Sequence, residues 1–246
     1  MRSEVFDGLL RGFVLAIGVV ATGWFVGHAL SVVRTTDRYV TVKGISEREV
    51  KADVAIWPLR IVAVDDDLMK AHAQLDASTA KTRDFLSRNG IDPNQAQVAG
   101  FSVRDAHADQ YRSEKAAGSR YVISQTLIVR SNEPDKVRLA TEKIGELVAG
   151  GVVLSSGAEY QPSGPTFIFT QLSGLKPPMI AEATARAREA AEQFARDSGS
   201  HVGRIRRANQ GTFEILARDQ APGITEASQL SKTVRVVSTV EYLLEN

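Results

Sequence analysis

The residues of this sequence that could do chemistry are few and widely spaced. His107 and Asp109 are two residues apart, so on a strand they would share one side, as a general base and its orienting carboxylate do. No third partner, whether a nucleophile or a further metal ligand, can be identified for this pair. An enzyme that uses His107 and Asp109 is therefore our third functional hypothesis, behind two non-enzymatic ones.

A second candidate is the acidic triplet Asp65, Asp66 and Asp67, whose carboxylates could bind a cation. A segment with helical apolar spacing begins directly after it, and Asp is a favoured residue at a helix N-cap. We therefore predict that the triplet caps a helix. His72 falls on the apolar stripe of that helix, and we interpret it as a residue at the edge of the core.

The sequence motifs of the common enzyme classes are missing. There is no phosphate-binding loop, no GxGxxG after a strand, no GxSxG and no HExxH. The four histidines stand far apart, and the absence of cysteine excludes disulfides, thiol catalysis and thiolate metal sites. We predict a protein that is not an enzyme and has no cofactor or metal.

Charge gives no indication of a nucleic-acid partner. The 30 basic and 29 acidic residues leave a formal net charge of +1, so no overall basic field exists. Arg204, Arg206 and Arg207 form a short basic patch, which a solvated strand edge explains as well as a nucleic-acid contact would. We predict no nucleic-acid binding.

The longest apolar run of the chain covers residues 12–33. Its 22 residues include no Asp, Glu, Lys or Arg, and a helix of that length crosses the ~30 Å apolar layer of a membrane. We predict a short tail (1–11), a transmembrane anchor (12–33) and a linker (34–38). The alternative is a secretory signal cleaved after Ser31, but the run exceeds the usual ~7–15 apolar residues of such signals.

Either interpretation sends the rest of the chain across a membrane. We expect a single-pass protein of the cell inner membrane whose C-terminal body is periplasmic, because a long C-terminal domain translocates largely regardless of charge. Within the run, Gly23, Gly27 and Ser31 make a stripe of small residues at four-residue spacing. Such stripes let two membrane helices approach closely, so we predict helix packing there. We interpret His28 as an interfacial residue.

The body, residues 39–246, is predicted to be one α+β domain. Strand patterns with period two alternate with three helical patterns, in the order strand pair, helix, repeated three times, then a closing strand pair. This order favours antiparallel sheets covered on one side by helices. The expected strands are 39–44, 54–64, 97–104, 121–130, 152–160, 166–172, 201–216 and 232–244, and the expected helices are 68–89, 132–150 and 179–198.

Two details of this prediction concern connections. We expect 39–44 and 54–64 to form a hairpin, with Pro58 at an edge or a bulge. Loops at 112–118 and 219–229 are candidate contact surfaces, because binding residues often lie on loops held by a rigid scaffold.

The body also resembles the SIMPL-domain family of bacterial envelope proteins, which are often described as oxidative-stress-defence or periplasmic immunogenic proteins. The segments that carry the likeness are spread over residues 38–244 and match in order and spacing: 42–44, 90–93, 101–103, 121–126, 135–137, 185–192, Gly199, Gly203 and 234–237. The resemblance implies an α+β protein that assembles into large ring- or channel-like oligomers. It implies no catalytic residues.

Our first functional hypothesis is therefore a non-enzymatic, membrane-anchored envelope protein that forms a homo-oligomer through sheet edges and helix faces. A role in envelope integrity or stress tolerance would follow from the resemblance alone. The second hypothesis is a binding module for a small ligand or an envelope partner protein.

Overall fold

The computed structural model describes residues 16–27, 38–107, 119–155 and 164–245. These residues form two compact units, each assembled from separated segments of the chain. Unit 1 comprises residues 1–46, 179–212 and 236–246, and unit 2 comprises residues 47–178 and 213–235. Five helices and two antiparallel sheets are present in the described part of the chain, so the predicted α+β class is confirmed.

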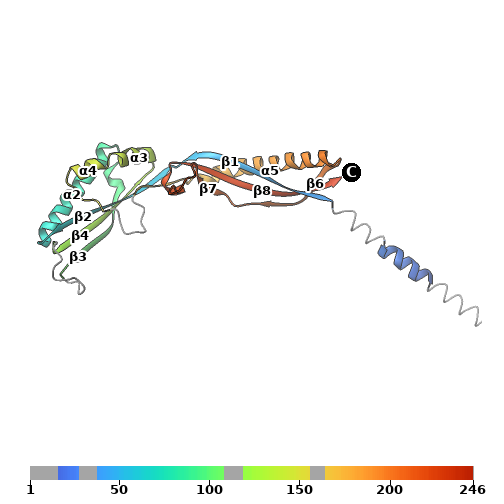
Figure 1. Ribbon diagram of the computed structural model, residues 1–246, viewed down its shortest axis with the longest axis horizontal. Helices are drawn as coiled ribbons and strands as arrows, with labels where there is room; N and C mark the ends of the chain where they lie inside the picture. The colour runs from blue at the N-terminus through green and yellow to red at the C-terminus, as the bar shows by residue number, and fades with distance from the viewer. Residues whose placement is uncertain (1–15, 28–37, 108–118, 156–163, 246) are drawn as a thin grey trace, which may run out of the picture. The chain divides into compact units, whose positions relative to one another are not determined.

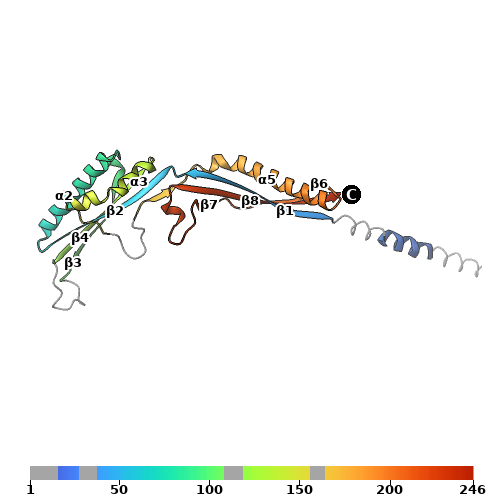
Figure 2. The same ribbon diagram turned by 45° about the horizontal axis from the view of Figure 1, so that its top comes forward.

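Unit 2 contains an antiparallel sheet in the order β3-β4-β2-β5. Its strands are β2 (Val54–Asp65), β3 (Ala96–Asp105), β4 (Tyr121–Ser131) and the short β5 (Thr166–Ile168). The helices α2 (Leu68–Arg88), α3 (Pro134–Glu142) and α4 (Gly145–Ala149) lie on one face of this sheet in both views (Figure 1, Figure 2). Unit 2 is thus two-layered, as the strand-and-helix order of the sequence predicts.

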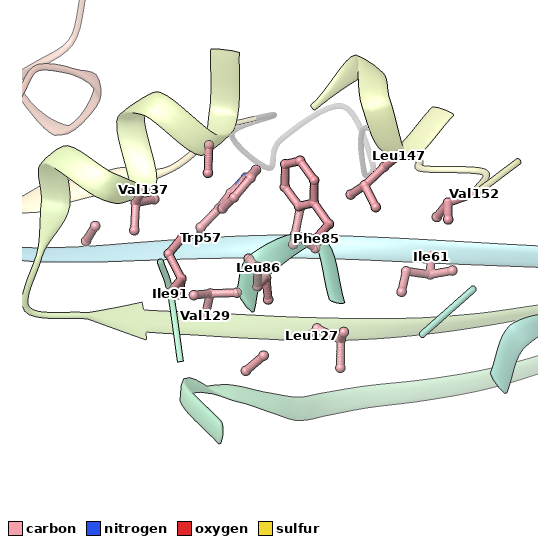
Figure 3. Close-up of a cluster of buried hydrophobic side chains, with 14 of the residues drawn as sticks. Trp57, Ile61, Phe85, Leu86, Ile91, Leu127, Val129, Val137, Leu147 and Val152 are labelled. Atoms are coloured by element: carbon pink, nitrogen blue, oxygen red, sulfur yellow. The ribbon is translucent and has the colours of Figure 1, made fainter. Parts of the chain in front are cut away.

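The core of unit 2 follows from alternation along its two central strands. Odd-numbered residues of β2 such as Trp57 and Ile61 are buried, as are Leu127 and Val129 of β4. Phe85 and Leu86 of α2 pack against them (Figure 3). Burying each large apolar side chain contributes about 1.5–3 kcal/mol, so this set fixes which sheet face the helices cover.

The N-terminal cap of α2 confirms one prediction. The Asp67 carboxylate accepts hydrogen bonds from the backbone N–H groups of Met69 (2.8 Å) and Lys70 (3.4 Å). At the other end, Gly90 has a φ of 73°, the left-handed conformation that closes a helix. His72 differs from the prediction, because it is exposed beside Asp76 and Phe101.

Pro58 lies in β2 where that strand has an open edge. The backbone N–H of Val62 donates to Val153 and the C=O of Arg60 accepts from Ser155, so even-numbered residues of β2 direct their polar groups away from β4. β5 pairs with β2 only at residues 54–56. The nitrogen of Pro58 carries no hydrogen and cannot donate a hydrogen bond. It faces the side of β2 beyond the last residue paired with β5, so no hydrogen bond of the sheet is lost there.

Unit 1 is built on parts of three strands and one helix. The strands are β1 (Tyr39–Lys51), β8 (Ser231–Glu245) and β6 (His201–Gln210), in the order β1-β8-β6, and β7 (Glu214–Ala217) pairs with the unit 2 part of β8. α5 (Leu172–Asp197) runs along β1 and β8 (Figure 1, Figure 2). Val42 and Val240 of the strands pack against Ala187 and Ala191 of α5.

A glycine permits α5 to lie close to β1. A Cβ atom built on Gly44 would stand 1.8 Å from the carbonyl oxygen of Ala183 and 2.5 Å from the nitrogen of Ala187. Helix backbone therefore occupies the space that any side chain at this position would need. The buried alanines of α5, predicted to let the helix lie close to a sheet, are fully inaccessible at Ala183, Ala187 and Ala191.

Three predictions were wrong in extent or pairing. No hairpin forms between 39–44 and 54–64, because β1 continues to Lys51 and pairs with β8 whereas β2 pairs with β4 and β5. The helix expected at 132–150 is divided at Lys143 into α3 and α4. The strand expected at 201–216 is divided into β6 and β7.

The third strand pair is the largest difference. Within the described part of 152–160, only an isolated bridge between Ile61 and Leu154 is present, and β5 covers just three of the residues expected at 166–172. The chain instead enters α5 at Leu172, so Pro177 and Pro178 lie inside the helix rather than before it. The threefold strand-pair repeat is therefore not complete.

The apolar N-terminal run is described only at residues 16–27, which are helical. Among the described helices, none has the length and apolar character needed to cross a membrane.

We predict that Gly44→Ala destabilises the chain by about 2–3 kcal/mol, because the added methyl group must displace the backbone of α5. Thermal unfolding followed by circular dichroism measures this. The matched control is Gly100→Ala in β3, where nothing lies within 4 Å of the added atom. Equal stability of the two variants would contradict the close approach of α5 to β1.

Candidate functional site

Of the His107–Asp109 pair in the third functional hypothesis, the structure describes His107 alone. His107 is exposed and its backbone N–H donates to the Asp105 carboxylate (2.9 Å), whereas Asp109 lies outside the described residues. Asp105 is bound by the Arg120 guanidinium at 3.0 Å, which holds the pKa of that carboxyl below its ordinary value. Asp105 is therefore the acceptor of an ion pair with Arg120.

The acidic triplet serves the local structure at all three positions. Asp67 caps α2, Asp65 accepts from the backbone of Asp67 and the side chain of Gln74, and Asp66 accepts from the backbone N–H of Arg120 (2.9 Å). No group of three or more His, Cys, Asp or Glu residues that could hold a metal occurs among the residues described.

The predicted membrane-packing residues are only partly described. Gly23 and Gly27 lie in the helix at 16–27, and nothing is within 4 Å of a Cβ built on either, so this stripe is open to a partner. Ser31 and His28 lie outside the described residues, as does the predicted contact loop 112–118.

The other predicted contact loop, 219–229, borders a hollow in unit 2. Its cavity volume is about 490 Å³. Phe167 of β5 and Ala227 of the loop provide apolar surface, while Arg138, Thr141 and Glu142 of α3 provide polar groups. The remaining residues that line it are Gly164, Pro165, Thr166, Thr225 and Ser228. A concave surface with a few polar groups on apolar walls is the usual form of a small-ligand site.

Asp53, in the connection between β1 and β2, and its neighbour Ala52 position two of the segments that border the hollow. Its carboxylate accepts from the backbone N–H (2.8 Å) and the hydroxyl (2.6 Å) of Thr170, and its own N–H donates to the carbonyl of Ile168 (3.0 Å). The adjacent Ala52 N–H donates to the Leu230 carbonyl (2.8 Å), just after the loop. Two consecutive residues therefore position both β5 and the loop.

The loop itself is closed by side-chain contacts. The Gln229 amide accepts from the backbone N–H of Asp219 (3.1 Å) and donates to its carbonyl (2.9 Å), which joins the two ends of the loop. The ammonium of Lys232, which is fully buried, donates to the backbone carbonyl of Glu226 at 2.6 Å and pairs with the Glu226 carboxylate. A short 3₁₀ turn, η2 (Glu226–Ser228), is stabilised in this way.

The polar side chains of this hollow already have partners within the protein. Thr141 and Ser228 donate their hydroxyl hydrogens to the carbonyls of Val137 and Thr225, both at 2.8 Å, and Arg138 is paired with Glu142. The Ser228 oxygen also accepts from the backbone N–H of Thr225 (3.3 Å), and each of the two hydroxyl oxygens has a lone pair left for a ligand. The carboxylate of Glu142 is the acidic group among the residues that line the hollow, and it is held by Arg138.

The sequence identified the loop but not the hollow. Pro, Gly and polar residues at 219–229 signalled a loop, and nothing in the spacing of α3 or β5 indicated that either would lie beside it. Gln229 and Lys232 could not be recognised in advance, because each acts through the backbone of a residue several positions away.

These observations define an α+β protein with antiparallel sheets and an open hollow beside the 219–229 loop. The chain belongs to the SIMPL family, since the model of that family, described as "Protein of unknown function (DUF541)", matches residues 40–242. The resemblance found in the sequence is thereby confirmed over nearly the whole body. A comparison with curated proteins finds no match for the chain.

We predict that acid weakens the fold through Asp53. Burial alone would raise the pKa of Asp53, but the hydrogen bonds from Thr170 offset this and lower it. A carboxyl with a lowered folded-state pKa stabilises the protein above its unfolded pKa, and that contribution is lost as pH falls through the folded pKa. Asp53→Asn should therefore cost about 1–2 kcal/mol at neutral pH and progressively less in acid.

Urea unfolding at a series of pH values measures this difference. Asp84→Asn is the matched control, because Asp84 is an exposed carboxylate without a hydrogen bond or ion pair among the described residues. A constant difference between wild type and Asp53→Asn at every pH would show that the charge of Asp53 is irrelevant.

Proposed function

We propose that this chain is a non-enzymatic, membrane-anchored envelope protein that self-assembles into a large, ring- or channel-like homo-oligomer. The anchor would be residues 12–33, in the cell inner membrane, with the body in the periplasm. A role in envelope integrity or stress tolerance rests on the SIMPL resemblance.

The observation that carries the anchor is the exposure of the N-terminal helix. Val19, Val20, Trp24 and Phe25 are 70%, 72%, 66% and 68% exposed, although all are apolar. In water a helix that is apolar on all sides gains nothing by remaining uncovered, whereas lipid would cover every side of it. The uncharged run of which this helix is a part is long enough to span a bilayer.

Sheet edges supply the support for assembly. β3 is the outer strand of its sheet, and three of its apolar side chains, Val98, Phe101 and Val103, are about half exposed. An outer strand of this kind offers backbone N–H and C=O groups for pairing with another chain. Apolar side chains on the same strand would be buried by such pairing.

A second function, binding of a small ligand or an envelope partner protein, is favoured by the hollow beside the 219–229 loop. Its accepting hydroxyl oxygens and apolar walls suit a neutral or weakly polar group better than a strongly charged one. Recovery of a different protein after cross-linking, from a chain that is itself monomeric, would favour this function over assembly.

We predict that the full chain is extracted from membranes only by detergent and that light scattering then gives a protein mass several times 26.7 kDa. A monomer in detergent would contradict assembly. Release of the chain by high salt or alkali without detergent would contradict the anchor, so the two parts of the proposal fail separately.

We further predict that the double substitution Gly23→Leu, Gly27→Leu weakens self-association of the N-terminal helix, because the larger side chains keep two backbones apart. Cross-linking of the full chain in detergent measures the fraction of dimeric and larger species. Gly18→Leu is the matched control, since Gly18 is equally open but lies on the opposite side of the helix. An equal loss of cross-linking in both variants would remove the stripe as the packing surface.

A further inference from the structure

One end of the unit 1 sheet carries a concentration of positive charge. Residues 38–46, 201–212 and 236–245 contain five basic side chains and two acidic ones, Glu241 and Glu245. The basic residues are Arg38, Lys43, Arg204, Arg206 and Arg207, and we call them the basic strand end. The whole chain is nearly neutral, so this excess is a local property of the sheet.

The sheet register brings the arginines toward one end of the sheet, whereas Lys43 lies five residues farther along β1 than Arg38. The backbone N–H of Leu244 donates to the Arg38 carbonyl (2.8 Å), and His201 is paired with Glu245, so β1 begins, β6 begins and β8 ends at the same place (Figure 1). Arg206 lies over the ring of Tyr39, with 4.3 Å from its guanidinium carbon to the ring centre. The cluster thus spans both outer strands of the sheet.

The charges are accessible. Lys43, Arg204 and Arg207 are exposed and form no ion pair among the described residues, although Arg207 lies opposite Glu241 in the register. The Glu245 side chain lies over Gly203, where a Cβ would be 2.4 Å from its carboxylate oxygen. The two acids therefore leave an excess of three positive charges on the unit 1 segments of this sheet.

Chain length places this end near the proposed anchor. The apolar run ends at Val33 and β1 begins at Tyr39, and six residues reach at most about 21 Å however they are arranged. If residues 12–33 span the membrane, the start of β1 cannot lie farther than that from the end of the span. Arg206 is in contact with Tyr39 and is held to the same region.

We propose that the basic strand end binds the headgroups of anionic phospholipids at the membrane surface, an inference that rests on the anchor proposed above. Guanidinium groups bind phosphate oxygens through paired N–H donors, and Tyr is enriched at the level of lipid headgroups. Arg204, Arg206 and Arg207 lie along β6, most of which is exposed, and this suits an extended anionic surface. The contact fixes the orientation of unit 1 at the membrane.

The chain contains no cysteine, so one introduced cysteine can carry a fluorescent label at a known place. Thr41→Cys is suitable, because Thr41 is exposed on β1 close to Tyr39 and is outside the basic strand end. The labelled full chain is inserted into nanodiscs of phosphatidylcholine, or of phosphatidylcholine mixed with phosphatidylglycerol. A nitroxide quencher on the lipid headgroups then reports how closely the label approaches the surface.

We expect stronger quenching in the phosphatidylglycerol discs, and loss of that increase at high salt, because salt screens contacts between exposed charges. Arg204→Gln with Arg207→Gln should lower the ratio of bound to unbound orientations about fivefold for each charge removed. Arg204→Lys with Arg207→Lys should retain the increase. The control is Lys70→Gln with Arg130→Gln, two exposed cations of unit 2 without ion pairs among the described residues, which should change nothing.

Insertion with equal quenching in both kinds of disc would overturn the headgroup contact and leave the anchor standing. Phosphatidylglycerol-dependent quenching that persists in the Arg204→Gln, Arg207→Gln variant, with unchanged circular dichroism, would likewise overturn the assignment to these arginines. Failure of the wild-type chain to insert into either disc would overturn the anchor and this inference with it. Dependence on an added acidic protein rather than on the lipid would assign the surface to a protein partner.

Discussion

The fold depends on the two-residue connection between β1 and β2, which consists of Ala52 and Asp53. β1 ends at Lys51 and β2 begins at Val54, yet the two strands belong to different sheets. Ala52 and Asp53 use their backbone and side-chain groups on Leu230, Ile168 and Thr170, which come from far along the sequence. Because a buried N–H without a partner is costly, the bond from the buried Ala52 fixes where Leu230 lies, and the bonds of Asp53 hold Ile168 and Thr170 beside it.

In unit 1, close packing of backbone against backbone fixes where the later helix α5 lies. α5 presents alanine to β1 and β8, and Gly44 leaves room for its carbonyl groups. Such a contact is specific because it tolerates no added atom, in contrast to exposed ion pairs such as Arg138–Glu142, which contribute little in water. In unit 1 stability therefore comes from small residues and strand alternation. Lys232, in unit 2, is a buried exception among charged side chains that mostly lie at the surface.

Much of the element pattern was predictable from local signals. Asp67 and Gly90 marked the ends of α2, and alternation marked β4 and β8, because capping and period-two burial depend only on near neighbours. The hairpin, the continuous helix at 132–150 and the third strand pair were wrong, since each required knowledge of a distant partner. Pro177 and Pro178 indicated a helix start, but α5 begins five residues before the first of them and includes both.

By itself, the sequence determined the α+β class, the SIMPL resemblance, the apolar run at 12–33 and the scarcity of grouped catalytic residues, because composition, periodicity and spacing are properties of short stretches. Only the tertiary structure decided that Asp53 supports a hollow beside the 219–229 loop and that Arg206 lies against Tyr39. Those juxtapositions join residues more than a hundred positions apart. They arise from the register of the strands. A single sequence limits that register only through its pattern of apolar residues, which must face the core.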